Sequence, residues 1–108
     1  FRYGMDIMRE TGIHPHLIRA GKANLFLSPL FRKTLATIAD AKIELYNTDG
    51  ALGAARGAAL GAGIYKDRAE TFASLTKLEE VLPDAGMKVA LDEAYAAWKA
   101  ELNRKLKN

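Results

Sequence analysis

Gly50-Ala51-Leu52-Gly53-Ala54-Ala55-Arg56-Gly57-Ala58-Ala59-Leu60-Gly61-Ala62-Gly63 is the stretch that decides the fold of this chain. It follows the strand-like segment Lys42–Tyr46. Glycine weakens a helix by about 1 kcal/mol relative to alanine, so a helix over this run has low intrinsic stability. The spacing of Gly53, Gly57 and Gly61 places them on one helix face. Because that face lacks side chains, a backbone or a flat ligand can approach it, and we expect such close packing to stabilise the helix.

The bulk composition indicates a globular chain. The 108 residues suit one domain or part of one, and 49% are apolar and 27% charged, close to the globular average. A net charge of +3 is mildly basic. Its only cluster is Arg104, Lys105 and Lys107, which complement the dipole of a C-terminal helix. The charge therefore gives no indication of a nucleic-acid partner.

Cysteine usage and the N-terminal segment bear on the compartment. The absence of cysteine excludes disulfide scaffolds and cysteine-based zinc sites. The segment Phe1–Gly12 contains four charged residues and no apolar core of a signal peptide. We therefore expect a cytoplasmic protein that does not bind membranes. A chain that begins at Phe1 and not at Met favours a fragment.

Helix and strand signals alternate along the chain, which predicts an α/β layer with parallel strands. Two or three short strands make a poor free-standing sheet, because parallel strands are normally flanked by others and covered on both faces. The sequence thus predicts a few parallel strands flanked by helices, as part of a larger sheet. Expected strands are Leu17–Ala20, Lys42–Tyr46 and the extended segment Leu78–Leu82; expected helices are Phe1–Thr11, a helix that starts at Ser28-Pro29, the Gly/Ala run, Glu70–Leu75 and Gly86–Lys105.

Two apolar stripes at helical spacing are expected to face the core. The single tryptophan, Trp98, belongs to the second stripe and is therefore expected to be a core residue. The first stripe is Leu30, Phe31, Leu35 and Ile38; the second is Leu91, Tyr95, Trp98, Leu102 and Leu106.

Gly21-Lys22 follows a strand, and a strand followed by a glycine turn and a helix start directs backbone N–H groups at anions. The Walker pattern fails, because His16 and Ala23 stand where it requires Gly and Ser or Thr. A plain turn glycine at Gly21 is the alternative interpretation. His14 and His16 could bind a metal together, but the sequence indicates no third ligand near them. No Ser-His-Asp or Cys-His arrangement for nucleophilic catalysis is present. We predict no catalytic residue and no metal site in this chain.

The two glycine features occur in a fixed order that resembles the C-terminal domain of the FGGY family of carbohydrate kinases, most closely the xylulokinases. In that family a strand enters a glycine-rich turn, a Ser-Pro-Leu-Trp-Arg-like helix start follows, and an acidic residue then leads into a Gly-Ala-Leu-Gly-Ala-Ala helix. Leu17–Arg32 and Thr48–Tyr65 carry the match, and Pro83-Asp84 before a long Tyr/Trp-containing helix is also similar. The resemblance covers nearly the whole chain.

This resemblance implies an actin-like ATPase (ribonuclease-H-like) fold, with residues 1–108 as the C-terminal segment of its nucleotide-binding domain. The full-length enzyme would bind ATP and Mg²⁺ and phosphorylate a sugar such as xylulose. Its sugar site and catalytic base would lie outside this chain, so the fragment alone would be inactive. The rest of the kinase chain would be its partner, with a homodimer as a further assembly. Cofactor-binding positions carried over are Gly21, Lys22, Asn24, Gly50 and Gly53.

The resemblance has departures and a competitor. The family's turn usually carries two or three consecutive glycines, whereas Gly21 stands alone here and Leu25–Ser28 are extra residues. Gly50 and Gly53 are expected beside the adenosine, and Gly57 and Gly61 are expected to serve helix-on-sheet packing. The competing hypothesis is a stand-alone α/β interaction module with no catalytic activity, in which the Gly/Ala helix packs against a partner.

Overall fold

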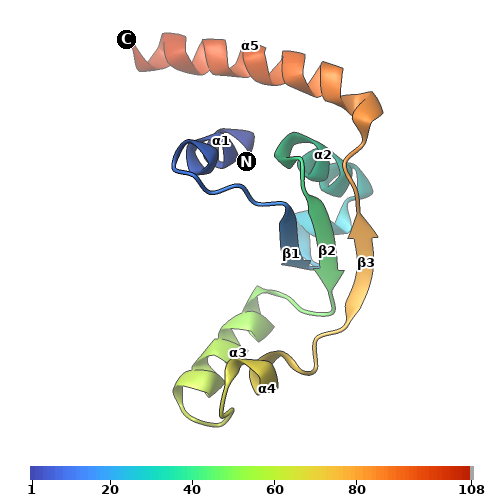
Figure 1. Ribbon diagram of the computed structural model, residues 1–108, viewed down its shortest axis with the longest axis vertical. Coiled ribbons are helices and arrows are strands. Elements are labelled where there is room, and N and C mark those ends of the chain that lie inside the picture. The colour runs from blue at the N-terminus through green and yellow to red at the C-terminus, as the bar shows by residue number, and fades with distance from the viewer. Residues whose placement is uncertain (108) are drawn as a thin grey trace.

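A three-stranded sheet in the order β1-β2-β3 forms the centre of the computed structural model, which describes residues 1–107 (Figure 1). β1 (Leu17–Gly21) and β2 (Lys42–Tyr46) are parallel, as predicted, and β3 (Lys77–Val81) runs antiparallel to β2. The expectation of parallel strands throughout is therefore wrong for β3. The chain leaves the carboxyl end of β2, stays at that end of the sheet and re-enters there, so the next strand must run in the opposite direction.

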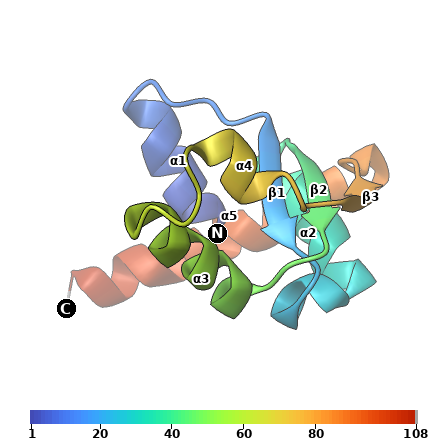
Figure 2. The same cartoon turned by 90° about the horizontal axis from the view of Figure 1, so that it is seen from below.

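Five α-helices lie around the sheet, with α2 packed on one face and the others toward its two ends (Figure 1). α1, α2 and α5 lie toward the amino ends of β1 and β2, while α3 and α4 lie beyond the carboxyl ends, as the view from below also shows (Figure 2). No helix within residues 1–107 is long and apolar enough to cross a bilayer. The α-helices are α1 (Arg2–Glu10), α2 (Pro29–Ala39), α3 (Gly50–Gly61), α4 (Arg68–Phe72) and α5 (Lys88–Leu106), with short 3₁₀ turns η1 (Asn24–Leu27) and η2 (Ala85–Met87).

Local signals in the sequence set the helix ends. Ser28 caps α2, accepting a hydrogen bond from Phe31 N at 3.2 Å, and Pro29 occupies the first helical position. At the end of α1, Gly12 has a φ of +88° and donates to Arg9 O, while Ile13 N donates to Met8 O. This pair of bonds is a Schellman motif, whose left-handed residue favours glycine.

The core lies between α2 and one face of the sheet. Leu35 and Ala36 of α2 pack against Ile43 and Leu45 of β2, which are fully buried because alternate residues of a strand share a face. The predicted stripe on α2 is only partly correct: Leu30 is 70% exposed. A smaller cluster formed by Met5, Ala39 and Ala41 joins α1 to the end of α2.

The peripheral helices α3 and α5 correct two expectations. α3 has no buried residue, and a Cβ added at Gly53, Gly57 or Gly61 would meet nothing within 4 Å. The expectation that the Gly/Ala helix packs closely is therefore wrong for the described part of the chain. This includes the expected helix-on-sheet packing of Gly57 and Gly61. Trp98 of α5 is 50% exposed and is not a core residue, because α5 lies along the outside of α1 and α2.

The chain is more extended than a compact domain of its length. Its radius of gyration is 17.1 Å, whereas about 13 Å is typical of 108 residues. Its accessible surface is 7351 Å², against about 5,900 Å² for a compact protein of 11.8 kDa. Much apolar surface of α3, α4 and α5 therefore remains exposed.

Candidate functional site

A hollow of about 330 Å³ opens at the carboxyl ends of β1 and β2, beside the start of α3. Three of the five predicted cofactor-binding residues, Gly21, Asn24 and Gly50, line it together, although Gly50 is distant from the others in the sequence. In open α/β sheets, ligands bind outside the carboxyl ends of parallel strands. The complete lining is Gly21, Ala23, Asn24, Leu25, Phe26, Asp49 and Gly50.

Each wall of this hollow has a local cause in the sequence. Asn24 adopts a left-handed φ of +53°, a conformation that Asn tolerates better than most residues, and it turns the chain from β1 into η1. On the other wall, Asp49 caps α3, its carboxylate accepting a hydrogen bond from Leu52 N at 2.9 Å. The turn after β1 and the start of α3 thus face each other across the hollow.

Gly21 is required by the chain itself. A Cβ at position 21 would lie 2.3 Å from the backbone oxygen of Thr48 and 2.9 Å from its carbonyl carbon. The kinase resemblance implied a glycine at this position because a nucleotide would lie close to the backbone. In the structure, the backbone after β2 already occupies the space that a side chain would need.

Gly50 and Gly53 differ from Gly21 because the space beside them is open. An added Cβ at either position meets no atom within 4 Å. Gly50 lines the hollow, whereas Gly53 lies about one turn further along α3 and is not among the lining residues. Both positions could therefore contact a ligand, with Gly50 nearer to the hollow.

Lys22, like Gly53, is a predicted residue that does not line the hollow. Its ammonium group lies 3.4 Å from the Glu79 carboxylate on β3. Arg32 binds the same carboxylate at 3.1 Å, with its own side chain only 8% exposed. Glu79 therefore holds Lys22 toward β3, and Lys22 would have to leave this ion pair to reach a ligand in the hollow.

A second hollow of about 420 Å³ lies next to the first, and Gly21 lines both. Its outer wall comes from Phe72 and Leu75, which sequence reasoning did not single out. Arg56 orders this region by donating to Thr48 Oγ1 at 2.7 Å and to Ser74 Oγ at 3.4 Å. No periodic signal identifies these wall residues, because the return of the chain after α3 brings them to β1.

The sheet face away from α2 is charged. Glu44 of β2 is only 6% exposed and accepts from Arg19 Nε at 3.3 Å and Tyr46 OH at 3.3 Å, with Lys77 Nζ 3.5 Å away. Burial raises the pKa of the Glu44 carboxyl, but the Arg19 hydrogen bond and the nearby lysine and arginine charges outweigh burial and lower the pKa below 4.5. Glu44 therefore stays ionised and links the three strands.

Within residues 1–107, no three His, Cys, Asp or Glu side chains form a group that could hold a metal ion. His14 and His16 line a separate hollow of about 300 Å³ near the amino end of β1, together with Arg2, Arg9 and other residues.

Comparison with known proteins finds no family model that matches the chain and no curated protein that is similar to it.

Proposed function

We propose that this chain is the ATP-binding part of a carbohydrate kinase that phosphorylates a sugar such as xylulose. The observation that supports this proposal is the convergence of Gly21, Asn24 and Gly50 on one hollow at the carboxyl ends of two parallel strands. The glycine turn and the Gly/Ala helix were singled out as separate motifs, and the fold brings their first residues together. The kinase resemblance, with its actin-like ATPase fold, predicts that arrangement.

The chemistry of the hollow suits the adenosine half of ATP better than the phosphates. Leu25 and Phe26 offer apolar contact to a flat base, and Gly50 leaves room beside it. The Asp49 carboxylate repels phosphate but can accept hydrogen bonds from ribose hydroxyls or from the adenine amino group. A volume near 330 Å³ is at the small end of ligand sites, so the phosphates would extend outward.

The remaining parts of the kinase lie outside this chain in this proposal. Mg²⁺ would neutralise phosphate charge, but no metal-binding group exists within the described residues, so its ligands would be the phosphates and the rest of the enzyme. The sugar site and the base that accepts the hydroxyl proton would also belong to the rest of the kinase, which would be this chain's partner. By itself the chain would bind nucleotide without transferring phosphate.

Nucleotide binding to the complete protein tests the proposal. We expect saturable ATP and ADP binding by calorimetry, and weakening by about tenfold or more in Gly50→Val, because the new side chain would fill the hollow without touching the fold. Gly61→Val on the same helix is the matched control and should bind like the native protein. Absence of binding to the native protein, or equal affinity in both variants, would overturn the assignment.

A stand-alone interaction module with no catalytic activity is the second candidate. Its support is the exposed apolar surface, since Leu52, Ile64 and Phe72 around α3 and α4 are all uncovered. Such a module would be a stable monomer or a defined homodimer without nucleotide affinity. Sedimentation analysis and the calorimetric titration together separate the candidates. A single well-defined species that does not bind ATP supports the module and contradicts the kinase.

A further inference from the structure

An aromatic hollow lies between α1 and α5. These two helices are at the opposite end of the molecule from α3 (Figure 1). The volume of the hollow is about 220 Å³. The rings of Tyr3 and Trp98 meet edge to face at 5.7 Å, and those of Tyr95 and Trp98 stack at 5.9 Å with 20° between their planes. Ile38 of α2 adds an aliphatic surface, and Phe1 and Arg2 complete the lining.

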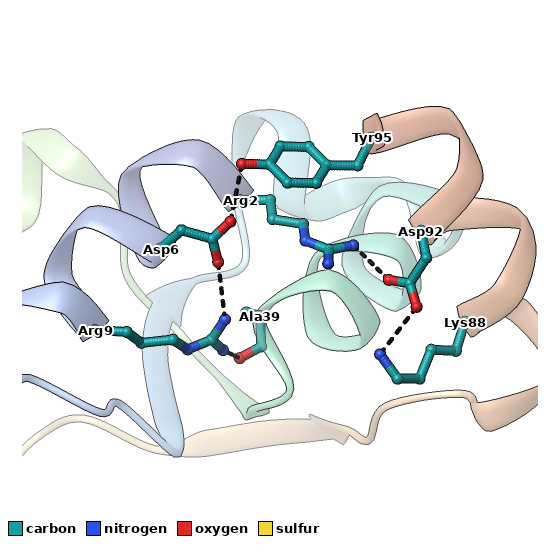
Figure 3. A network of polar contacts seen from close by, with 7 residues as sticks. All are labelled: Arg2, Asp6, Arg9, Ala39, Lys88, Asp92 and Tyr95. Carbon is teal, nitrogen blue, oxygen red and sulfur yellow. Dashed lines mark hydrogen bonds and ion pairs between the residues drawn. The ribbon is translucent and has the colours of Figure 1, made fainter. Parts of the chain in front are cut away.

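Hydrogen bonds hold the walls in place (Figure 3). Tyr95 donates its hydroxyl proton to Asp6 Oδ2 at 2.8 Å, which ties α5 to α1. Arg2 donates to Asp92 Oδ1, and its guanidinium carbon lies 4.4 Å from the centre of the Tyr95 ring. A ring entering the hollow would therefore meet surfaces that are already oriented, which lowers the entropic cost of binding.

The polar groups around the hollow favour a ligand that accepts hydrogen bonds over a cationic ligand. Both oxygens of Asp6 are engaged, by Tyr95 and by Arg9, and both oxygens of Asp92 are engaged, by Arg2 and by Lys88 (Figure 3). Neither carboxylate lines the hollow, and each is already paired with a cationic side chain, so neither is placed to bind a ligand cation. By contrast, Arg2 lines the hollow, and among the described residues its guanidinium donates a hydrogen bond only through Nη1, to Asp92.

The cationic side chains near the hollow also favour an anionic ligand. Lys99 Nζ lies 5.9 Å from the Tyr95 ring centre, so two cationic side chains, Arg2 and Lys99, already face that ring. A further cation would be repelled, although aromatic rings alone attract cations. An anionic group would gain a charge-assisted hydrogen bond from the guanidinium.

We propose that the Tyr3–Tyr95–Trp98 hollow binds a small aromatic carboxylate, with its ring against Trp98 and its carboxylate at Arg2. The volume is below the range of drug-sized sites, which limits the ligand to about one ring. This site is independent of the proposed nucleotide site, which lies beyond the other end of the sheet.

Benzoate, benzamide and benzylamine share one ring and differ in charge, and titrating each into the complete protein tests the proposal. Trp98 is the only tryptophan among the 108 residues, and its indole N–H resonance, assigned by its loss in Trp98→Phe, reports directly on this hollow. We expect saturable shifts with benzoate, and affinity for benzylamine lower by about tenfold, the effect of one charge-assisted hydrogen bond. Equal or tighter binding of benzylamine, or no saturable shift with any of the three, would overturn the proposal.

Variants separate the ring contact from the charge. Arg2→Lys keeps the charge but removes the planar guanidinium and its N–H donors, so benzoate should lose most of its advantage over benzamide. Tyr3→Ala removes an exposed wall and should weaken both ligands, while Leu106→Ala on α5, the helix of Trp98, should change neither. A native-like circular dichroism spectrum is the condition for using each variant. An Arg2→Lys protein that keeps full preference for benzoate contradicts the role of the guanidinium.

Discussion

The carbonyl oxygen of Thr48 lies 2.3 Å from the point that a Cβ on residue 21 would occupy. Gly21 ends β1 and Thr48 follows β2, so this contact closes the carboxyl edge of the two parallel strands. It also lies where both hollows at this edge meet, since Gly21 lines each of them. The contact makes Gly21 a structural requirement whether or not a nucleotide binds beside it.

Gly21→Ala should destabilise the fold by about 1–3 kcal/mol, the usual cost of forcing an extra group into a filled space. The atoms in the way belong to the backbone of Thr48 and cannot rotate aside. Urea unfolding followed by circular dichroism measures the effect. Gly53→Ala is the control, because its Cβ meets no atom within 4 Å. Equal unfolding midpoints for Gly21→Ala and the native protein would contradict the contact.

Gly57→Ala should stabilise the protein by about 0.5–1 kcal/mol, because alanine is the better helix former and the added methyl group points into open space. Gly63→Ala should do the opposite, since Gly63 has a φ of +76°, which L side chains rarely adopt. Thermal unfolding of the two variants gives the comparison. If a partner covers the glycine face in the complete protein, Gly57→Ala would lose stability there, which distinguishes an open face from a packed one.

Glu44 should make stability depend on acid pH. Its pKa is lowered in the folded chain, mainly by Arg19 and Lys77 acting against burial, so its contribution is present above its ordinary value of 4.5. That contribution is lost as the pH falls through the lower, folded pKa. We expect Glu44→Gln to flatten this part of the stability profile, measured by urea midpoints at several pH values. Glu93→Gln, at an exposed position of α5, should leave the native profile unchanged.

Tyr95→Phe should weaken the attachment of α5 and lower stability by about 1–2 kcal/mol, because it removes the hydrogen bond to the Asp6 carboxylate. Burial and that hydrogen bond raise the pKa of Tyr95 above 10.0, so its contribution is present below pH 10 and is lost as the pH rises through the folded pKa. Absorbance titration and urea unfolding measure both effects. Tyr3→Phe, whose hydroxyl is outside this network, should have little effect.

The candidate site illustrates how far the sequence could go. Gly21 and Gly50 were predicted as binding residues from the kinase resemblance, and the fold places both on one hollow. Lys22 was predicted with them, but its partner Glu79 belongs to β3, and no sequence pattern indicates that a strand would pass close enough to bind it. Phe72 was not predicted, because its place beside β1 depends on the path of the chain after α3.

By itself, the sequence determined where most helices and strands begin and end to within one to three residues, because caps and turns act over a few residues; α4, for example, is Arg68–Phe72 where Glu70–Leu75 was expected. Ser28, Asp49 and Gly12 occupy the positions that their side chains or backbone freedom favour. Only the tertiary structure decided the direction of β3, the exposure of Trp98 and the open glycine face of α3. These features depend on which distant segments meet, and the spacing of apolar residues specifies a buried face without specifying what will cover it.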